Sequence, residues 1–454
     1  MEDLCFAPIA ELAPLIREGA VSPLDLTGAF LDRIARLDPG LNSYLRVLPE
    51  RALEAAARTD AEVRNGAWRG PLHGVPLGLK DLFDVAGTPT SAQSRLYEHT
   101  VAAEDAPVVA RLDHAGAVVL GKQTLWEFAL GGISPGSLGR PARNPWGPGL
   151  DPGGSSSGSA AAVAAGLCTA ALGSDTGGSI RHPAAWCGLA GFKPSYDLID
   201  RRGVFPLAPT LDHVGLLARS AEDCGLLLEA ATGGAFRWVR RETLKGLRLG
   251  LATNFLEGDL APEPETLAAL HEAVGVLRDL GCEIVEARIP EPEGFSDVGM
   301  LISRSEGHAV HQATLQSSPG LYGHAARIRL TVGGAIRAAD YLNAQRWRTK
   351  LAAALAEATG GCDALLLPSV PRPAFALAEE VGPVARAFMM YTRLFNLTGA
   401  PALALPTGFS ADGLPLSMQL AASGGQDLLV LQIGAAFERA AAIPRRRPPG
   451  FAPQ

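Results

Sequence analysis

Residues 153–181 read GGSSSGSAAAVAAGLCTAALGSDTGGSIR, two clusters of glycine and serine on either side of an alanine-rich segment. Glycine lets backbone N–H groups turn sharply and approach a ligand closely. Consecutive amides in such a turn can point at one anion. A Gly/Ser run is more often a flexible linker, but residues 160–172 between the clusters are apolar and helix-prone and therefore require burial. The stretch predicts a site for acyl transfer, where a serine hydroxyl lies beside donors for an oxyanion.

A phosphate-binding loop is the other site typical of glycine-rich turns. Such a loop ends in Gly-Lys followed by serine or threonine, whose side chains contact the phosphates and their metal ion. Neither cluster is followed by this ending. The sequence therefore favours the acyl-transfer interpretation.

The composition bounds the class of protein. The chain has 454 residues, of which 47% are hydrophobic and 19% charged, as expected for a globular protein with a large core. Its net charge of −7 disfavours nucleic acid or an anionic membrane as a partner. The six cysteines are scattered, without a C-x-x-C pair, so we expect neither a disulfide framework nor a zinc site, and a reducing, cytoplasmic location. No signal peptide and no membrane-spanning stretch are expected.

Lysine is rare in this chain. Only five of the 40 basic residues are lysines, namely Lys80, Lys122, Lys193, Lys245 and Lys350. A desolvated lysine can lose its proton and act as a base, which arginine cannot. Lys80 follows the apolar run 75–79, so burial would lower its pKa. The alternative is an ion pair between Lys80 and Asp81 or another carboxylate.

Three further motifs accompany the glycine-serine stretch: HGVPLGLKD at 73–81, CGLAGFKP at 187–194 and FNLTGAPA at 395–402. With residues 153–181 they resemble the signature of the amidase signature family of serine hydrolases, over about residues 5–440. The resemblance implies an α/β fold, in which a single large domain has a central mixed β-sheet covered by helices on both faces. It also implies catalysis without a metal or cofactor.

The resemblance also implies a catalytic set. Ser179 is expected to be the nucleophile, Ser155 the proton relay that follows a cis peptide bond, and Lys80 the base. The expected oxyanion hole consists of the backbone amides of Thr176, Gly177, Gly178 and Ser179. Hydrogen bonds and ion pairing that support the loop are expected from Ser156, Asp175 and Arg181.

Other polar residues receive structural interpretations. Ser157 stands where the family usually has glycine, which affects the expected shape of the loop, and Ser159 is a rival serine. Cys187 matches a buried structural cysteine of the family. His308 and His311 could share a helix face as metal ligands, but no third ligand lies near them in sequence, so no metal is expected.

The leading interpretation is hydrolysis of a small carboxylic amide through an acyl-enzyme on Ser179. Esters and carbamates are expected as side substrates, because the acyl chemistry is the same. No nucleic acid or membrane partner is expected, and the formation of a homodimer stays open. The pocket is expected to be apolar, with residues 291–345 as a variable roof and contacts from Trp126, Gly131, Gly132 and Ile133.

Two other functions stay open. The first is the glutaminase A-type subunit of a tRNA-dependent amidotransferase, which shares the three catalytic positions and supplies ammonia to a partner. The tyrosine- and asparagine-rich segment usual in that subunit does not appear between Ser303 and Lys350. The second is a non-catalytic binding protein on the same scaffold, which the presence of all three catalytic positions disfavours.

The chain shows no internal repeat and no clear domain linker. We expect residues 1–66 to form an N-terminal helical segment that packs on the core, 67–230 the signature core, 231–440 the rest of the same domain, and 441–454 a mobile tail. Apolar runs predict buried strands at 75–79 and 118–120 and short apolar strands at 364–367 and 402–405. Strands are also predicted at 247–251 and, from alternating apolar and polar residues, at 283–289. Helical patterns predict helices from Ser22 to Pro39-Gly40, at 50–64, at 108–114, from Ser220 and at 264–280.

Overall fold

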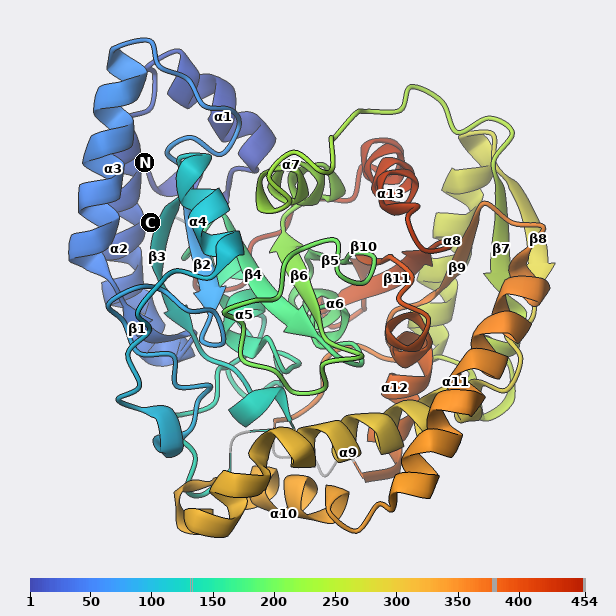
Figure 1. Ribbon diagram of the computed structural model, residues 1–454. Helices are drawn as coiled ribbons and strands as arrows, with labels where there is room; N and C mark the ends of the chain where they lie inside the picture. The colour runs from blue at the N-terminus through green and yellow to red at the C-terminus, as the bar shows by residue number, and fades with distance from the viewer. Residues whose placement is uncertain (131, 133, 378–381, 452–454) are drawn as a thin grey trace.

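The computed structural model describes residues 1–130, 132, 134–377 and 382–451. In this part of the chain the strands form one mixed sheet of eleven strands, in the order β1-β3-β2-β4-β6-β5-β10-β11-β9-β7-β8 (Figure 1). The strands are β1 (Tyr44–Val47), β2 (Pro76–Lys80), β3 (Val118–Gln123), β4 (Ala170–Asp175), β5 (Ala190–Lys193), β6 (His213–Ala218), β7 (Arg248–Ala252), β8 (Glu283–Ala287), β9 (Ala364–Pro368), β10 (Ala402–Phe409) and β11 (Pro415–Ala421).

Helices surround this sheet. They are α1 (Ile9–Arg17), α2 (Pro23–Leu41), α3 (Pro49–Arg64), α4 (Pro107–His114), α5 (Ser157–Ala164), α6 (Arg181–Cys187), α7 (Ala221–Ala231), α8 (Pro264–Asp279), α9 (Pro292–Ser317), α10 (His324–Gly333), α11 (Ala338–Thr359), α12 (Gly382–Leu397) and α13 (Asp427–Ala441). Short 3-10 helices lie at Glu2–Phe6, Arg95–Tyr97, Glu127–Ala129, Thr253–Phe255, Gly258–Leu260 and Pro319–Leu321.

The sheet is covered on both faces, as the sequence predicts. A β-carbon on Gly191 of β5 would meet Ala184 of α6, whereas Gly434 of α13 lies against Leu403 and Leu405 of β10. Gly191 pairs across the sheet with the residue between these two leucines. Because neighbouring residues of a strand point to opposite faces, α6 and α13 lie on opposite sides of the sheet. The α/β fold with a central mixed sheet is therefore confirmed.

The central strands are buried along their whole length. Every residue of β2, β3, β4, β5, β6, β9 and β11 is buried. This is the pattern of strands covered on both faces, which read as short apolar runs and do not alternate. The apolar runs at 75–79, 118–120, 364–367 and 402–405 correspond to strands for this reason.

Two local predictions were wrong. Helix α2 does not end at Pro39-Gly40 but continues to Leu41, because Asn42 adopts a left-handed conformation (φ 54°) and its N–H donates to the Asp38 carbonyl (2.7 Å). Only the first half of the segment 160–172 is helical, and its end enters β4. The N-terminal segment also contributes β1, which pairs with β3 and which the helical pattern did not predict.

The two ends of the described chain lie close together (Figure 1). Arg33 of α2 is buried and donates to the Phe451 carbonyl (3.0 Å), and Arg447 pairs with Asp3 (2.8 Å). Residues 442–451 therefore lie against the N-terminal segment, although a mobile tail was expected there.

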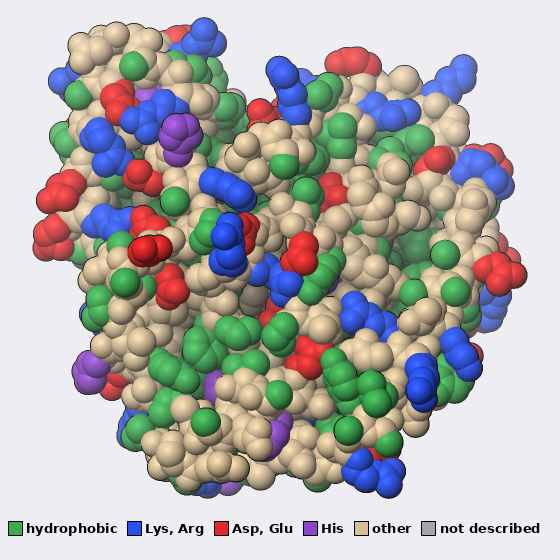
Figure 2. Space-filling view, viewed as in Figure 1, with side chains coloured by type: hydrophobic (Ala, Val, Ile, Leu, Met, Phe, Trp, Pro, Cys, Tyr) green, Lys and Arg blue, Asp and Glu red, His purple; other side chains and the backbone are tan. Residues whose placement is uncertain are grey.

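Helices α9, α10 and α11 lie together at one end of the molecule, with α12 beside α9 (Figure 1). They form the region expected to roof the pocket. In Figure 2, hydrophobic side chains gather just above α9, while acidic and basic side chains are interspersed over the rest of this face. Among the described residues, no helix is both long enough and apolar enough to span a bilayer.

Candidate active site

Lys80 ends β2, which lies between β3 and β4 in the sheet, and is completely buried. Strand β2 runs parallel to β4, with Leu79 paired to Leu172, so the carboxyl ends of both strands meet at one edge. The Lys80 Nζ donates to the Ser155 Oγ (2.8 Å) and to the Ser174 Oγ (2.9 Å). The fold therefore brings the expected base and the expected relay into direct contact.

The alternative ion pair between Lys80 and Asp81 does not form. The Asp81 carboxylate lies 2.7 Å from the Nζ of Lys122, and both of these side chains are buried. Among the described residues, no carboxylate lies within ion-pair distance of Lys80. Burial lowers the pKa of Lys80 from 10.5 to about 7, although the charges of Asp175 and Asp212 partly oppose this effect. An amine with this pKa is partly neutral at physiological pH and can accept a proton.

Ser155 follows a cis peptide bond from Gly154, as the resemblance implies. The Trp126 indole packs directly on this bond, since a β-carbon on Gly154 would lie 2.2 Å from its ring. The backbone N–H of Trp126 also donates to the Ser155 carbonyl (3.0 Å). Trp126, expected in the substrate pocket, thus lies at the cis peptide bond.

The loop of residues 176–180 connects β4 to α6 and carries the expected nucleophile. Ser179 is partly exposed, whereas the residues on either side of it are buried. The Ser156 N–H donates to the Ser179 carbonyl (3.2 Å), which ties this loop to the segment after the cis bond. Within the described chain the Ser179 hydroxyl has no hydrogen-bond partner, so its link to Ser155 is not closed. Catalytic hydrogen bonds often tighten only when substrate binds.

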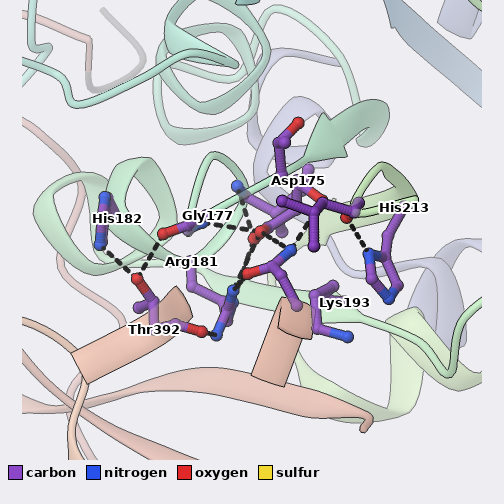
Figure 3. Close-up of polar contacts among 12 residues, drawn as sticks. Asp175, Gly177, Arg181, His182, Lys193, His213 and Thr392 are labelled. Carbon is purple, nitrogen blue, oxygen red and sulfur yellow. Dashed lines mark hydrogen bonds and ion pairs between the residues drawn. The ribbon is translucent and has the colours of Figure 1, made fainter. Parts of the chain in front are cut away.

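Asp175 and Arg181 bracket this loop and bind each other (Figure 3). Both are fully buried, and the guanidinium donates to both carboxylate oxygens (3.0 and 2.9 Å). Burial by itself would raise the pKa of Asp175, but the charge and hydrogen bonds of Arg181, with the amide of Asn396, hold it well below its usual range. The pair is a bidentate, charge-assisted contact that fixes both ends of the loop.

Helix α12 supports the loop from outside. The Thr392 hydroxyl donates to the Gly177 carbonyl (2.6 Å), and Arg181 donates to the Thr392 carbonyl (2.8 Å) (Figure 3). Gly178 has φ +131°, and a β-carbon there would lie 2.5 Å from both His182 and Thr392. Only glycine fits this position, because it needs both the unusual backbone conformation and the space.

The expected oxyanion hole is only partly available. The Gly178 N–H donates to the Asp175 Oδ1 (2.7 Å) and is therefore occupied within the chain. The amides of Gly177 and Ser179 have no hydrogen-bond partner among the described residues. These two amides remain candidate donors, together with the backbone amide of Thr176. The Thr176 hydroxyl itself donates to Asp212 (2.6 Å).

The other expected residues have separate positions. The Ser156 Oγ donates to the Ser174 carbonyl (3.2 Å), and the Ser159 Oγ to the Leu172 carbonyl (3.5 Å). The Ser157 Oγ is buried without a partner in the described chain. All three hydroxyls thus lie inside the core around α5, not at the surface of the loop.

The remaining candidates lie away from the catalytic loop or outside the described chain. The Cys187 Sγ is buried and donates to the Pro152 carbonyl (3.5 Å). The His308 ring contacts the Leu330 carbonyl, and the His311 ring the Tyr322 hydroxyl. Besides Trp126, three residues were expected in the pocket. Gly132 is described, and Gly131 and Ile133 lie outside the described residues.

Two residues beside Lys80 were not found from the sequence. Ser174 accepts the second hydrogen bond of Lys80 and lines a cavity of about 60 Å³ together with Asp212. Burial raises the pKa of Asp212 to about 6, against the opposing hydrogen bond from Thr176. The position of Ser174 directly before Asp175 was the one signal in the sequence for Ser174. Asp212 lies far from the motifs in sequence and had no such signal.

Known proteins resemble this chain along almost its whole length. A family model described as Amidase matches residues 25–431. The chain is 39% identical to an amidase of Pseudomonas putida, with 99% of both chains covered. It is 37% identical to a protein of Thermus thermophilus named as a subunit of glutamyl-tRNA(Gln) amidotransferase, covering 95% of this chain and 97% of that one. A crystal structure of an amidase matches with a TM-score of 0.86 at 35% identity, covering 95% of this chain and 99% of that chain. The protein belongs to the amidase family of amide-hydrolysing enzymes, whose signature motifs its sequence carries.

Proposed function

We propose that this enzyme hydrolyses small carboxylic amides through a covalent acyl-enzyme on Ser179. The observation that carries the proposal is the buried Lys80, whose ammonium contacts two serine hydroxyls and no carboxylate of the described chain. A lysine held in this way has a lowered pKa and a hydroxyl to exchange protons with. This is the arrangement that general-base catalysis requires.

The proton path follows from these contacts. Neutral Lys80 takes the proton of the Ser155 hydroxyl, which takes the proton of Ser179 as the Ser179 oxygen attacks the amide carbon. The tetrahedral oxyanion forms against the amides of Gly177 and Ser179. When it collapses, the C–N bond breaks, and the departing amine receives the proton back through Ser155. Water then attacks the acyl-enzyme and passes a proton along the same path to Lys80. When this second tetrahedral intermediate collapses, the bond from the acyl carbon to the Ser179 oxygen breaks, the Ser179 oxygen takes that proton back, and the acid is released.

The range of substrates follows from the same chemistry. Esters and carbamates present the same carbonyl carbon to Ser179, with leaving groups that are no harder to expel. We therefore include aryl esters and urethanes as side substrates. The proposal includes no nucleic-acid partner, and homodimer formation is a question for size-exclusion chromatography with light scattering.

The test is labelling with a fluorophosphonate probe followed by intact-mass analysis. We expect one adduct on the wild type and on Ser317→Ala, an exposed serine at the end of α9 that serves as a matched control. We expect no adduct on Ser179→Ala, and turnover of a panel of primary amides and anilides that disappears with it. An adduct that persists in Ser179→Ala would overturn the assignment of the nucleophile.

The second candidate function is that of an amidotransferase component that supplies ammonia to a partner. The relative from Thermus thermophilus, which is named as part of such an enzyme, favours it by its 37% identity over almost the full length. The test is glutamine turnover by the isolated chain and by the chain purified from its own organism under mild conditions. Glutaminase activity that requires a co-purifying tRNA-binding protein would establish this function in place of the first.

A further inference from the structure

Arg393 of α12 extends toward the catalytic loop. Its Nη1 donates to the Ser296 carbonyl of α9 (2.9 Å), and its Cδ would lie 2.3 Å from a β-carbon on Gly299 of the same helix. Its Nε and Nη2 lie 3.1 and 3.3 Å from the place where a β-carbon on Gly177 would be. The Nε–Nη2 edge of the guanidinium therefore borders the loop two positions before Ser179.

This edge has no acceptor in the described chain. The Nε atom is buried and makes no hydrogen bond. The Nη2 atom also donates to no described residue, and no described carboxylate lies within ion-pair distance of Arg393. Arg181, on the other side of the same loop, shows the contrast, since all of its nitrogens are bound to oxygen atoms. A buried N–H without an acceptor, such as the Nε–H of Arg393, is costly, and proteins normally satisfy such groups.

The charges near Arg393 are of both signs, and no described carboxylate lies within ion-pair distance of it. The pKa of Arg393 is lowered to about 10, chiefly by burial and in part by the charge of Arg304 on α9, while the charge of Asp297 opposes the shift. Arg304 forms no ion pair within the described residues. Arg393 and Arg304 together carry one more positive charge than Asp297 balances, which favours an anion beside Arg393.

From these contacts we infer that Arg393 binds a carboxylate group of the substrate through its Nε–Nη2 edge, so that the preferred amides carry an acidic group besides the reacting amide. The inference rests on the proposed hydrolysis at Ser179 and names its substrate class. The Nε–H and Nη2–H point in one direction and match the two oxygens of a carboxylate, which is the bidentate geometry that arginine favours. Arg393 is a specificity-determining residue in this scheme.

The test compares matched substrates. Monoamides of dicarboxylic acids with two to four methylene groups are paired with neutral primary amides of the same chain length. We expect the wild type to favour the acidic member by about 100-fold in kcat/KM, because a charge-assisted bidentate contact can supply a preference of this size. Arg393→Met should abolish this preference by raising KM for the acidic member, so that the two members of a pair then have similar kcat/KM values. Arg327→Met, an exposed arginine of α10, is the control and should keep the preference.

Two results would overturn the inference while leaving the hydrolytic function intact. One is a wild type that does not discriminate between the paired amides. The other is an Arg393→Met variant whose kcat/KM falls equally for the acidic and the neutral amide, which is the result expected if Arg393 only supports the loop.

A binding experiment separates failure of the inference from failure of the proposed function. Calorimetry with the acidic monoamides uses Ser179→Ala, alone and combined with Arg393→Met, so that no turnover is needed. Binding that depends on Arg393 in an enzyme that hydrolyses no amide would support the subsite and refute the hydrolysis. Absence of binding, or binding that Arg393→Met leaves unchanged, would refute the subsite.

Discussion

Three of the five lysines are buried at or near the ends of β2, β3 and β5, and their partners differ. Lys122 lies against the carboxylate of Asp81. Lys193 donates to the carbonyls of Pro194 and Ala400. Lys80 alone among these three contacts only hydroxyls, which can accept a hydrogen bond from the amine and donate one to it. Hydroxyl partners therefore suit a lysine that gains and loses a proton.

The pH dependence of the reaction follows from the Lys80 pKa. Because the folded pKa is about 7, below the usual 10.5, the neutral base is present above about pH 7 and lost below it. We expect the rate of phosphonylation of Ser179 to rise with pH to a plateau, with its midpoint near 7. Stopped-flow labelling between pH 5 and 10 measures this. A midpoint near 10 would show that the pKa of the base is not lowered in the folded enzyme, and a rate that does not change with pH would show that Lys80 is not the base.

The same shift links Lys80 to stability. Between about pH 7 and 10.5 the unfolded chain binds the proton that folded Lys80 has released, so its contribution to the free energy of unfolding rises with pH over this window.

The two hydroxyl partners of Lys80 are expected to differ in importance. Ser155→Ala breaks the proposed proton path and should lower kcat by about 1,000-fold, within the range of general-base effects. Ser174→Ala removes the other hydroxyl but leaves the Lys80–Ser155 contact, so about a tenfold loss is expected. Kinetics of the two variants on one amide substrate measure the ratio. Equal losses would assign the relay to both serines.

At the scale of elements, the catalytic loop is built by β4, α6 and α12 together. Strand β4 ends at Asp175, α6 begins at Arg181, and α12 contributes Thr392 and Asn396 to the polar network between them. The loop between β4 and α6 cannot hold this shape by itself, since its hydrogen bonds reach residues more than 200 positions away. The position of α12 is therefore a condition for the geometry at Ser179.

The Thr392 contact can be tested without changing the size of the side chain. Thr392→Val removes the hydroxyl that donates to the Gly177 carbonyl and leaves this buried carbonyl without that donor. We expect a loss of about 1–2 kcal/mol in the free energy of unfolding, from denaturant titration. The labelling rate of Ser179 should fall by about tenfold, because the loop loses its support.

The control for this prediction is Thr349→Val on the exposed face of α11, where the hydroxyl donates to the Gln345 carbonyl in its own helix. It should change neither quantity. A Thr392→Val variant that labels Ser179 at the rate of the wild type would show that α12 does not set the loop geometry.

At the scale of the whole molecule, all eleven strands of the described chain belong to one sheet. Strand β1, near the N-terminus, lies at one edge, and β10 and β11, near the C-terminus, lie between β5 and β9. Strands from both ends of the sequence therefore belong to the same sheet, and α12 from the C-terminal part supports the loop that carries Ser179.

The C-terminal segment is the exception to this rule. It contacts the rest of the molecule through the Phe451 carbonyl, surface ion pairs and the partly buried side chains of Ile443 and Phe451, and it does not enter the sheet. Deletion of residues 442–454 should therefore lower the free energy of unfolding by about 2–4 kcal/mol, because Arg33 loses one acceptor and two apolar side chains lose their contacts. The labelling rate of Ser179 should not change.

Chemical denaturation and fluorophosphonate kinetics on the same truncated preparation test this prediction. Arg447→Ala, which removes only the surface ion pair with Asp3, is the control and should cost less than about 1 kcal/mol. Loss of Ser179 labelling in the truncated chain would mean that the tail supports the catalytic site.

Several elements could be predicted because their signals are local. The runs at 75–79 and 118–120 are apolar throughout, as strands covered on both faces must be, and they correspond to β2 and β3. The end of α2 could not be predicted, because its C-terminus depends on Asn42 and on a contact with Asp38, which overrule Pro39 as a stop signal. Strand β1 could not be predicted either, because its place at the sheet edge depends on pairing with β3.

The sequence by itself determined the fold class and the residues that could carry the chemistry, since glycine, serine and lysine leave a local pattern in the motifs around Lys80, Ser155 and Ser179. Only the tertiary structure decided which partners these groups have. It pairs Asp81 with Lys122 and leaves Lys80 to two serines, gives the Gly178 amide to Asp175, and brings Arg393 against Gly177. The physical reason is that a pKa, a free donor or an unpaired charge depends on groups brought together from distant parts of the chain, and spacing along the sequence does not encode those distances.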